Sequence, residues 1–127
     1  RLFIMIIGIG CDIIEINRVE KAVQSDSFKK RVFTTGEIAY CESRGKQQFA
    51  SFGARFAAKE ALLKAFGTGL RGGTLTEIEV LNDELGCPKM TLSGYHKELA
   101  ESKGVQKIHV TLSHSKDSAM AYVVLED

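Results

Sequence analysis

The feature that most constrains this chain is a helical pattern that runs from about residue 47 to residue 66 and ends at Gly67. Projected at about 100° per residue, it has two apolar faces, one of large side chains and one of alanines. A helix that is apolar on two sides has to be mostly buried, so the rest of the chain must fold around it. The first face carries Phe49, Phe52, Phe56 and Leu63, and the second carries Ala50, Ala54, Ala57, Ala58, Ala61 and Ala65.

Two charged residues, Glu60 and Lys64, lie one turn apart in the narrow strip between these faces, beside Gly53. As an ion pair at i and i+4 they would stabilise the helix by about 0.2–0.5 kcal/mol. Charges held on a buried helix cost desolvation energy unless another group pairs with them. The alternative is therefore a phosphate and metal site, and the helix alone does not decide between the two.

The remaining segments mix strands and helices without a regular βαβ rhythm. An isoleucine-rich segment with interleaved glycines predicts a buried strand over residues 4–14. Alternating apolar and polar residues on either side of a turn at 115–118 predict a hairpin. We therefore predict an α+β fold, with a small antiparallel-type sheet packed on one long and several short helices. Further strands are expected over 76–82 and 89–92, and short helices over 17–24, 26–33, 35–44 and 94–103.

Two helix starts have recognisable caps. The segment from Thr34 to Glu37 fits a capping box, in which Thr34 is the N-cap and Glu37 reaches back to it. Ser93 is expected to cap the helix over residues 94–103.

Length and composition indicate one soluble domain over residues 1–127. Met5 is a candidate for the natural start, which would make Arg1 to Ile4 an extension. The net charge of +1 argues against a general nucleic-acid binder. No apolar run reaches the roughly 20 residues of a membrane span, and the first residues lack the cleavage site of a signal peptide. We expect no nucleic-acid partner and no membrane association.

The cysteines Cys11, Cys41 and Cys87 have no paired spacing. An odd number without a CxxC pair indicates free thiols in a reducing compartment rather than disulfides or a zinc site. We therefore expect a cytoplasmic protein.

The segment from Gly8 to Asp12, Gly-Ile-Gly-Cys-Asp, stands out within the first strand. It is not a dinucleotide fingerprint, because no third glycine follows at the right offset. Glycines inside an apolar strand indicate a close backbone approach or a bulge. Asp12 at the end of this strand is either a cap for the next helix or a ligand for a hard metal ion.

Asp12 and Glu60 together would suit Mg²⁺, which usually takes one or two protein carboxylates and completes its shell with phosphates and waters. The cations Lys64, Lys116 and Arg55 would suit phosphate groups. The Gly67-Thr68-Gly69 turn offers backbone N–H groups and a hydroxyl, but at a helix C-terminus, where the dipole disfavours anions. It is therefore no P-loop.

The histidines carry weaker signals. His114 lies at the end of the first hairpin strand, where a surface or capped histidine is the simplest interpretation and a site residue the alternative. His96 and His109 show no pattern and are expected to be structural.

Three blocks of this sequence together resemble the short, bacterial-type 4′-phosphopantetheinyl transferases, the holo-acyl-carrier-protein synthases. The blocks are Gly8 to Glu15, Phe56 to Gly69 and Val110 to His114, in the order and spacing of the family. The resemblance covers essentially the whole chain from Met5 to Glu126, and the middle block is the most specific. It implies the 4′-phosphopantetheinyl transferase fold.

The resemblance also implies a reaction used in fatty acid biosynthesis. A serine hydroxyl of an apo-acyl carrier protein attacks the β-phosphate of coenzyme A. The 4′-phosphopantetheine group moves to the serine, and adenosine 3′,5′-bisphosphate leaves. The metal that the resemblance implies is Mg²⁺, with Mn²⁺ as an alternative. Family members of this length form homotrimers with a site at each subunit interface.

Residue roles follow from matching positions. Asp12 and Glu60 resemble the metal ligands, and Lys64, beside the Gly67-Thr68-Gly69 turn, a pyrophosphate contact. His114 and Lys116 resemble the contacts on the other side of the nucleotide cleft, with the 3′-phosphate as target of the basic group.

Further matches concern the adenine and the carrier protein. Pro88 matches a turn that lines the adenine, although Cys87 stands where the family has Lys. Arg18 matches a basic residue that faces the acidic recognition helix of the carrier protein. The general base is expected to be Glu60, directly or through a metal-bound water, with Glu37 as second candidate.

Two other functions remain open at this point. A metal-dependent hydrolase of the coenzyme A pyrophosphate would use the same acids and cations, but it would consume coenzyme A without a carrier protein. A non-catalytic coenzyme-A-binding trimer would bind coenzyme A after Glu60→Ala and give no product.

Overall fold

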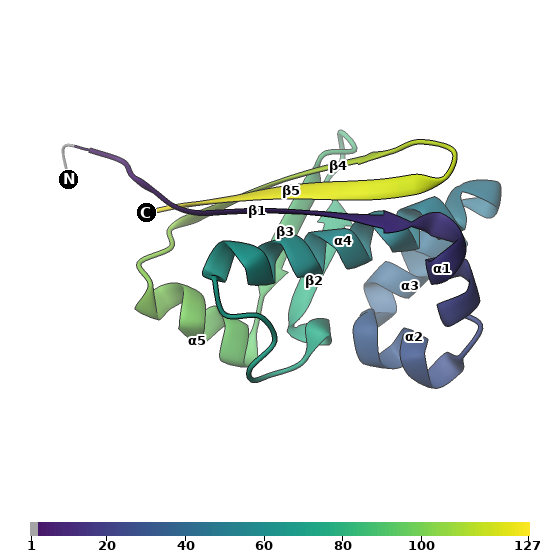
Figure 1. Ribbon diagram of the computed structural model, residues 1–127, viewed down its shortest axis with the longest axis horizontal. Helices are drawn as coiled ribbons and strands as arrows, with labels where there is room; N and C mark the ends of the chain where they lie inside the picture. The colour runs from purple at the N-terminus through teal and green to yellow at the C-terminus, as the bar shows by residue number, and fades with distance from the viewer. Residues whose placement is uncertain (1–2) are drawn as a thin grey trace.

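A central helix, α4 (Gln48–Phe66), organises the molecule in the computed structural model, which describes residues 3–127. An antiparallel sheet in the order β1-β5-β4 covers one side of this helix, as Figure 1 shows. A second, two-stranded antiparallel sheet pairs β2 with β3. The strands are β1 (Ile6–Glu15), β2 (Ile78–Asn82), β3 (Pro88–Leu92), β4 (Lys107–His114) and β5 (Ser118–Glu126).

The short helices gather at the two ends of α4 (Figure 1). Three of them lie near its start, and α5 lies near its end. This arrangement confirms the predicted α+β fold. The predicted extension over Arg1 to Ile4 begins with residues 1 and 2, which lie outside the described part. The helices are α1 (Ile16–Ala22), α2 (Asp26–Val32), α3 (Thr35–Glu42) and α5 (Gly94–Ser102), with 3₁₀ turns η1 (Gly45–Gln47) and η2 (Leu75–Glu77).

Both features predicted as alternatives for the glycines of β1 are present: a close backbone approach, and a shift of register with β5 between Ile6 and Gly8. A Cβ atom at Gly8 would overlap the carbonyl oxygen of Ala65, and one at Gly10 would overlap that of Ala61. Alanines on α4 and glycines on β1 therefore let helix and strand lie almost backbone to backbone. This contact fixes where Asp12, two residues further along β1, lies along the axis of α4.

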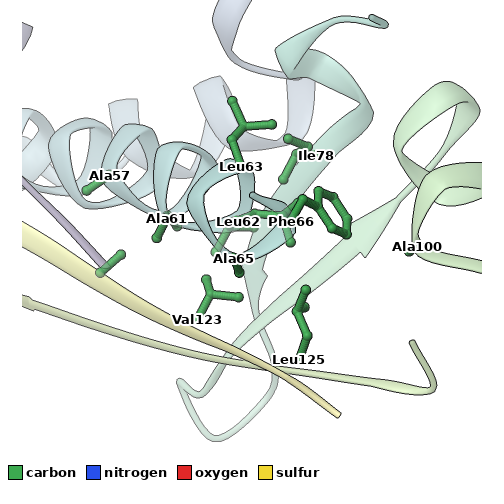
Figure 2. Packing of buried hydrophobic residues seen from close by; sticks show 13 residues of the cluster. Ala57, Ala61, Leu62, Leu63, Ala65, Phe66, Ile78, Ala100, Val123 and Leu125 are labelled. Atoms are coloured by element: carbon green, nitrogen blue, oxygen red, sulfur yellow. The ribbon is translucent and has the colours of Figure 1, made fainter. Parts of the chain in front are cut away.

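The two predicted apolar faces of α4 pack into two cores, except that Leu63, predicted on the phenylalanine face, belongs to the core of the alanine face. The alanine face, with Leu62, packs against the sheet, where it meets Val123 and Leu125 (Figure 2). Phe52 belongs to a second core formed with α1, α2 and α3. The second core consists of Val19, Val23, Val32, Phe33, Cys41 and Phe52.

The prediction that β1 is a buried strand is wrong. It is an edge strand, and α4 covers only one of its faces. On the other face, Ile9 and Ile13 are 57% and 68% exposed. This apolar outer face continues over Met120 and Tyr122 of β5. The isoleucines predicted a strand correctly, but a strand pattern does not say whether a second layer of the same chain exists to cover it.

A buried ion pair that the sequence analysis missed joins α4 to its surroundings. The Nζ of Lys59 donates to Glu37 Oε1 at 2.8 Å and to the carbonyl oxygens of Leu75 and Ile78 at 3.0 and 2.6 Å. Both side chains are fully buried. Burial lowers the pKa of Lys59, and the carboxylate of Glu37 acts against this. The pair ties α4 to α3 and to the segment that enters β2.

The two predicted caps differ in outcome. Thr34 and Glu37 form the predicted capping box at the start of α3. Ser93 occupies the N-cap position of α5, but its side chain makes no capping hydrogen bond. Among residues 3–127, no helix has the length and apolar character needed to cross a membrane.

Candidate active site

Asp12 and Lys64 meet where β1 crosses the last turns of α4. Side chains alternate along a strand, so Asp12 points to the same face as Gly10, toward the helix. The Nζ of Lys64 donates to Asp12 Oδ1 and to the carbonyl oxygen of Cys11, each at 3.0 Å. Asp12 is half-buried and Lys64 exposed. The hydrogen bond and the negative charge of Asp12 raise the pKa of the lysine. Asp12 is therefore no helix cap, since the N-cap of α1 is Glu15.

Glu60 lies one turn before Lys64 and is half-buried. Burial raises the pKa of its carboxyl group, the nearby charge of Asp12 raises it further, and Lys64 acts in the opposite direction. The two carboxylates thus lie close enough to repel each other. In the described residues the ion pair of Lys64 is with Asp12 and not with Glu60, so the simple i,i+4 pair does not form. One lysine thus faces two carboxylates, and this excess of negative charge favours a site that takes a further cation.

A hollow of about 560 Å³ opens beside these groups. Its wall includes Glu60, Lys64 and the glycines that follow α4. Gly67 has φ +79° and ends the helix, as predicted, and its N–H donates to the carbonyl oxygens of Leu63 and Lys64. The Thr68 hydroxyl donates to the carbonyl oxygen of Gly69 at 3.2 Å. The complete lining is Glu60, Leu63, Lys64, Gly67, Gly69, Leu70 and Leu75.

The two carboxylates fit a magnesium ion that takes its other ligands from water and from a substrate. Within residues 3–127 there is no group of three or more His, Cys, Asp or Glu side chains that could hold a metal ion. Such a group would suit a structural metal site. Two carboxylates suit Mg²⁺, provided that water and phosphate oxygens supply the other ligands. Asp12 and Glu60 are such a pair.

His114 and Lys116 lie elsewhere, in a second hollow of about 490 Å³. Ala50, near the start of α4, lines this hollow, whereas Lys64 lines the first. Ala50 and Lys64 are separated by about 21 Å along α4, because a helix rises about 1.5 Å per residue. Lys46 adds a further cation that the sequence analysis missed, because an isolated lysine on a 3₁₀ turn carries no sequence signal. A single chain therefore does not bring all predicted site residues together.

Arg55 is a correction to the sequence analysis. Its side chain is 2% exposed, and its guanidinium donates to the carbonyl oxygen of Val80 at 3.1 Å and to Asn82 Oδ1 at 3.2 Å. It also lies over the ring of Tyr40. These contacts occupy the guanidinium inside the molecule, so Arg55 is not available to a phosphate. Its charge predicted a ligand contact, but its place on α4 makes it a structural donor.

The remaining predicted site residues are placed as follows. Pro88 begins β3 opposite Asn82 and lines neither hollow. Arg18 is exposed on α1 and borders an apolar groove formed with Phe28 and Phe56. His109 is exposed, with Nε2 3.5 Å from Glu126 Oε1.

Known proteins match almost the whole chain. A family model described as the 4′-phosphopantetheinyl transferase superfamily matches residues 8–123. The chain belongs to this superfamily. The "Holo-[acyl-carrier-protein] synthase" of Ruminiclostridium cellulolyticum is 48% identical over 120 residues, which are 92% of this chain and 90% of the relative. The resemblance stated from the sequence is confirmed.

Solved structures agree with the family. The holo-[acyl-carrier-protein] synthase of Neisseria meningitidis has a TM-score of 0.87 at 32% identity and covers 97% of this chain and 100% of its own. The synthase of Bacillus anthracis, solved in complex with CoA (3′,5′-ADP), has a TM-score of 0.80 at 40% identity and covers 97% and 98%. The fold is therefore that of the holo-acyl-carrier-protein synthases.

Proposed function

We propose that this protein transfers the 4′-phosphopantetheine group of coenzyme A to a serine of an apo-acyl carrier protein, and releases adenosine 3′,5′-bisphosphate. The observation that carries this proposal is the placement of Asp12, Glu60 and Lys64 together beside a hollow at the end of α4. Two acids and a lysine suit a diphosphate held with a metal ion. Family membership and the names of the relatives support the same reaction.

In this proposal Asp12 and Glu60 hold Mg²⁺, or Mn²⁺ in its place. When bound, the ion neutralises charge on the pyrophosphate and on the phosphoryl group during transfer. Lys64 is mostly exposed, so it can leave Asp12 and contact a pyrophosphate oxygen. Its charge then helps to hold the diphosphate in line for attack by the serine.

The proton of the attacking serine goes to Glu60, directly or through water. In the metal-free protein, burial and the charge of Asp12 raise the pKa of this carboxyl group. A carboxylate that holds Mg²⁺ is a weaker base, which favours the route through a water molecule. Glu37, the second candidate, is fully buried and receives hydrogen bonds from Lys59, Thr34 and Val80. It cannot reach a serine of another protein, so we assign it a structural role.

We further infer that the active unit is a homotrimer with a site at each subunit interface. Coenzyme A carries its 3′-phosphate and its pyrophosphate on one ribose, whereas the two cation-bearing hollows lie at opposite ends of α4. One chain cannot contact both phosphate groups with these two clusters, but two neighbouring copies can. The apolar outer face of β1 and β5 is a surface that such copies would cover.

The carrier protein is expected to dock beside α1. Arg18 offers a positive charge next to the apolar groove with Phe28 and Phe56. An acidic helix with apolar residues would fit both features, and the local charge would steer its approach. The thiols of Cys11, Cys41 and Cys87 are free, which suits the reducing cytoplasm.

The test is the intact mass of an apo-acyl carrier protein after incubation with this protein, coenzyme A and Mg²⁺. We expect a gain of one phosphopantetheine group, which is lost with EDTA and with Glu60→Ala. Arg18→Ala should weaken the use of carrier protein and leave binding of coenzyme A unchanged. Consumption of coenzyme A without any gain in mass would instead indicate the hydrolase. Binding without consumption would indicate the non-catalytic trimer.

A further inference from the structure

We propose that Tyr95 positions the loop over residues 67–74, which forms one wall of the hollow beside Glu60, and thereby sets the affinity for coenzyme A. This inference rests on the proposed function. Tyr95 lies on the first turn of α5 and does not line the hollow itself. It acts through the loop, so its role is to position and not to catalyse.

The loop needs support from outside. Gly67, Gly69 and Gly73 have φ values of +79°, +66° and +67°, which favour glycine. A glycine-rich segment loses much conformational entropy when it is held in one shape. Inside the loop, Arg71 Nε donates to the carbonyl oxygen of Thr68 at 2.8 Å. Further contacts have to come from neighbouring elements.

The ring of Tyr95 supplies such a contact in the middle of the loop. A Cβ atom at Gly72 would lie 2.8 Å from its Cε1 and 2.9 Å from its Cζ. A Cβ atom at Gly73 would lie 2.9 Å from the Cβ of the same tyrosine. The backbone of these two glycines therefore lies directly on Tyr95, with no room for a side chain between them.

Hydrogen bonds to Glu77 hold the first turn of α5, which carries Tyr95, in place. His96 is 1% exposed, and its Nδ1 lies 2.9 Å from Glu77 Oε1. The backbone N–H of His96 donates to the same oxygen at 3.3 Å, and the N–H of Ser93 donates to the carbonyl oxygen of Glu77 at 2.9 Å. These bonds hold the first turn of α5 against η2. Lys59 holds Leu75, the residue that follows the loop, by donating to its carbonyl oxygen.

The loop contributes Gly67, Gly69 and Leu70 to the hollow. If removing the ring lets the loop hold its present position only about a tenth of the time, the apparent Kd for a ligand of that wall rises about tenfold. The groups that carry the chemistry, Asp12, Glu60 and Lys64, lie on β1 and α4 and would stay in place. The expected signature is weaker binding with little change in kcat.

The experiment compares Tyr95→Ala with Tyr95→Phe, which keeps the ring, and with Glu98→Ala, an exposed position on the same helix. Calorimetry gives the Kd for coenzyme A, and kinetics give kcat and the KM values for coenzyme A and carrier protein. Amide exchange of residues 68–73 reports directly on the loop. Gly72→Ala, which would push the ring away from the other side, is an independent second variant.

We expect Tyr95→Ala and Gly72→Ala to raise the Kd and KM for coenzyme A about tenfold and to speed exchange in the loop. The KM for carrier protein, and both control variants, should stay within about twofold of the wild type. If Tyr95→Ala binds coenzyme A like the wild type, or loses kcat with unchanged affinity, the inference is wrong. If the wild type neither binds coenzyme A nor modifies a carrier protein, the proposed function is wrong and the inference falls with it.

Discussion

Glu60 is a residue whose charge costs the free protein stability, because burial and Asp12 raise its pKa. Because the pKa of this carboxyl group is higher in the folded state, the loss of stability is fully present at a pH above the folded-state pKa. It is absent at a pH below the unfolded-state pKa of about 4.3. With EDTA present, Glu60→Gln should therefore have a higher Tm than the wild type at pH 7. The difference should disappear as the pH falls below about 4. Thermal unfolding across this pH range tests the prediction, and a lower Tm of Glu60→Gln at pH 7 would contradict it.

Lys59 lies next to Glu60 but has a structural task. Breaking a buried ion pair from one side leaves a buried charge, so Lys59→Met should cost about 3–5 kcal/mol of unfolding free energy. The double variant with Glu37→Gln should recover part of this loss. Lys30→Met is the matched control, because Lys30 pairs with Asp26 on the exposed surface and should contribute less than about 1 kcal/mol. Urea unfolding gives all four values, and equal losses for Lys59→Met and Lys30→Met would refute the assignment.

The contact between β1 and α4 is the element-scale feature on which the site depends. Gly10→Ala would drive a Cβ atom into the carbonyl oxygen of Ala61, which belongs to the helix backbone and cannot turn away. We expect a loss of about 1–3 kcal/mol or more, together with lower activity, because Asp12 would move away from Glu60. Gly36→Ala is the control: its Cβ would lie 3.1 Å from the tip of Glu79, a flexible side chain. Comparable losses of stability and activity in both variants would rule out this explanation.

The elements themselves could largely be predicted, because each has a clear period or cap. The two-faced α4, the hairpin of β4 and β5 and the capping box of α3 all follow from local patterns. Local patterns could not distinguish the roles of three cations on α4, which are Arg55, Lys59 and Lys64. Lys59 is buried with a partner 22 residues earlier. Arg55 is buried against the Val80 carbonyl oxygen and the Asn82 side chain of β2, and Lys64 faces the hollow. Their roles depend on contacts between distant segments, and the family resemblance identified only that of Lys64.

At the scale of the whole molecule, the outer face of the β1-β5-β4 sheet remains uncovered in a single chain. Ile13→Glu places a charge on the exposed apolar side of β1 and should convert a trimer to monomers with loss of transfer activity. Leu85→Glu is the control, because Leu85 is 94% exposed but isolated in the turn between β2 and β3. Light scattering after gel filtration measures the mass. A fully active monomeric wild type would exclude the proposed trimer.

The separation of the two hollows along α4 has a genetic consequence. We consider a trimer in which each site combines Glu60 of one copy with His114 of another. A Glu60→Ala chain still has an intact His114 hollow, and a His114→Ala chain still has an intact Glu60 hollow. When the two inactive variants are mixed, unfolded and then refolded together, the mixture should regain part of the wild-type activity. Neither variant should regain activity when it is refolded alone. In a cell that carries two different defective alleles, this arrangement would allow each to complement the other.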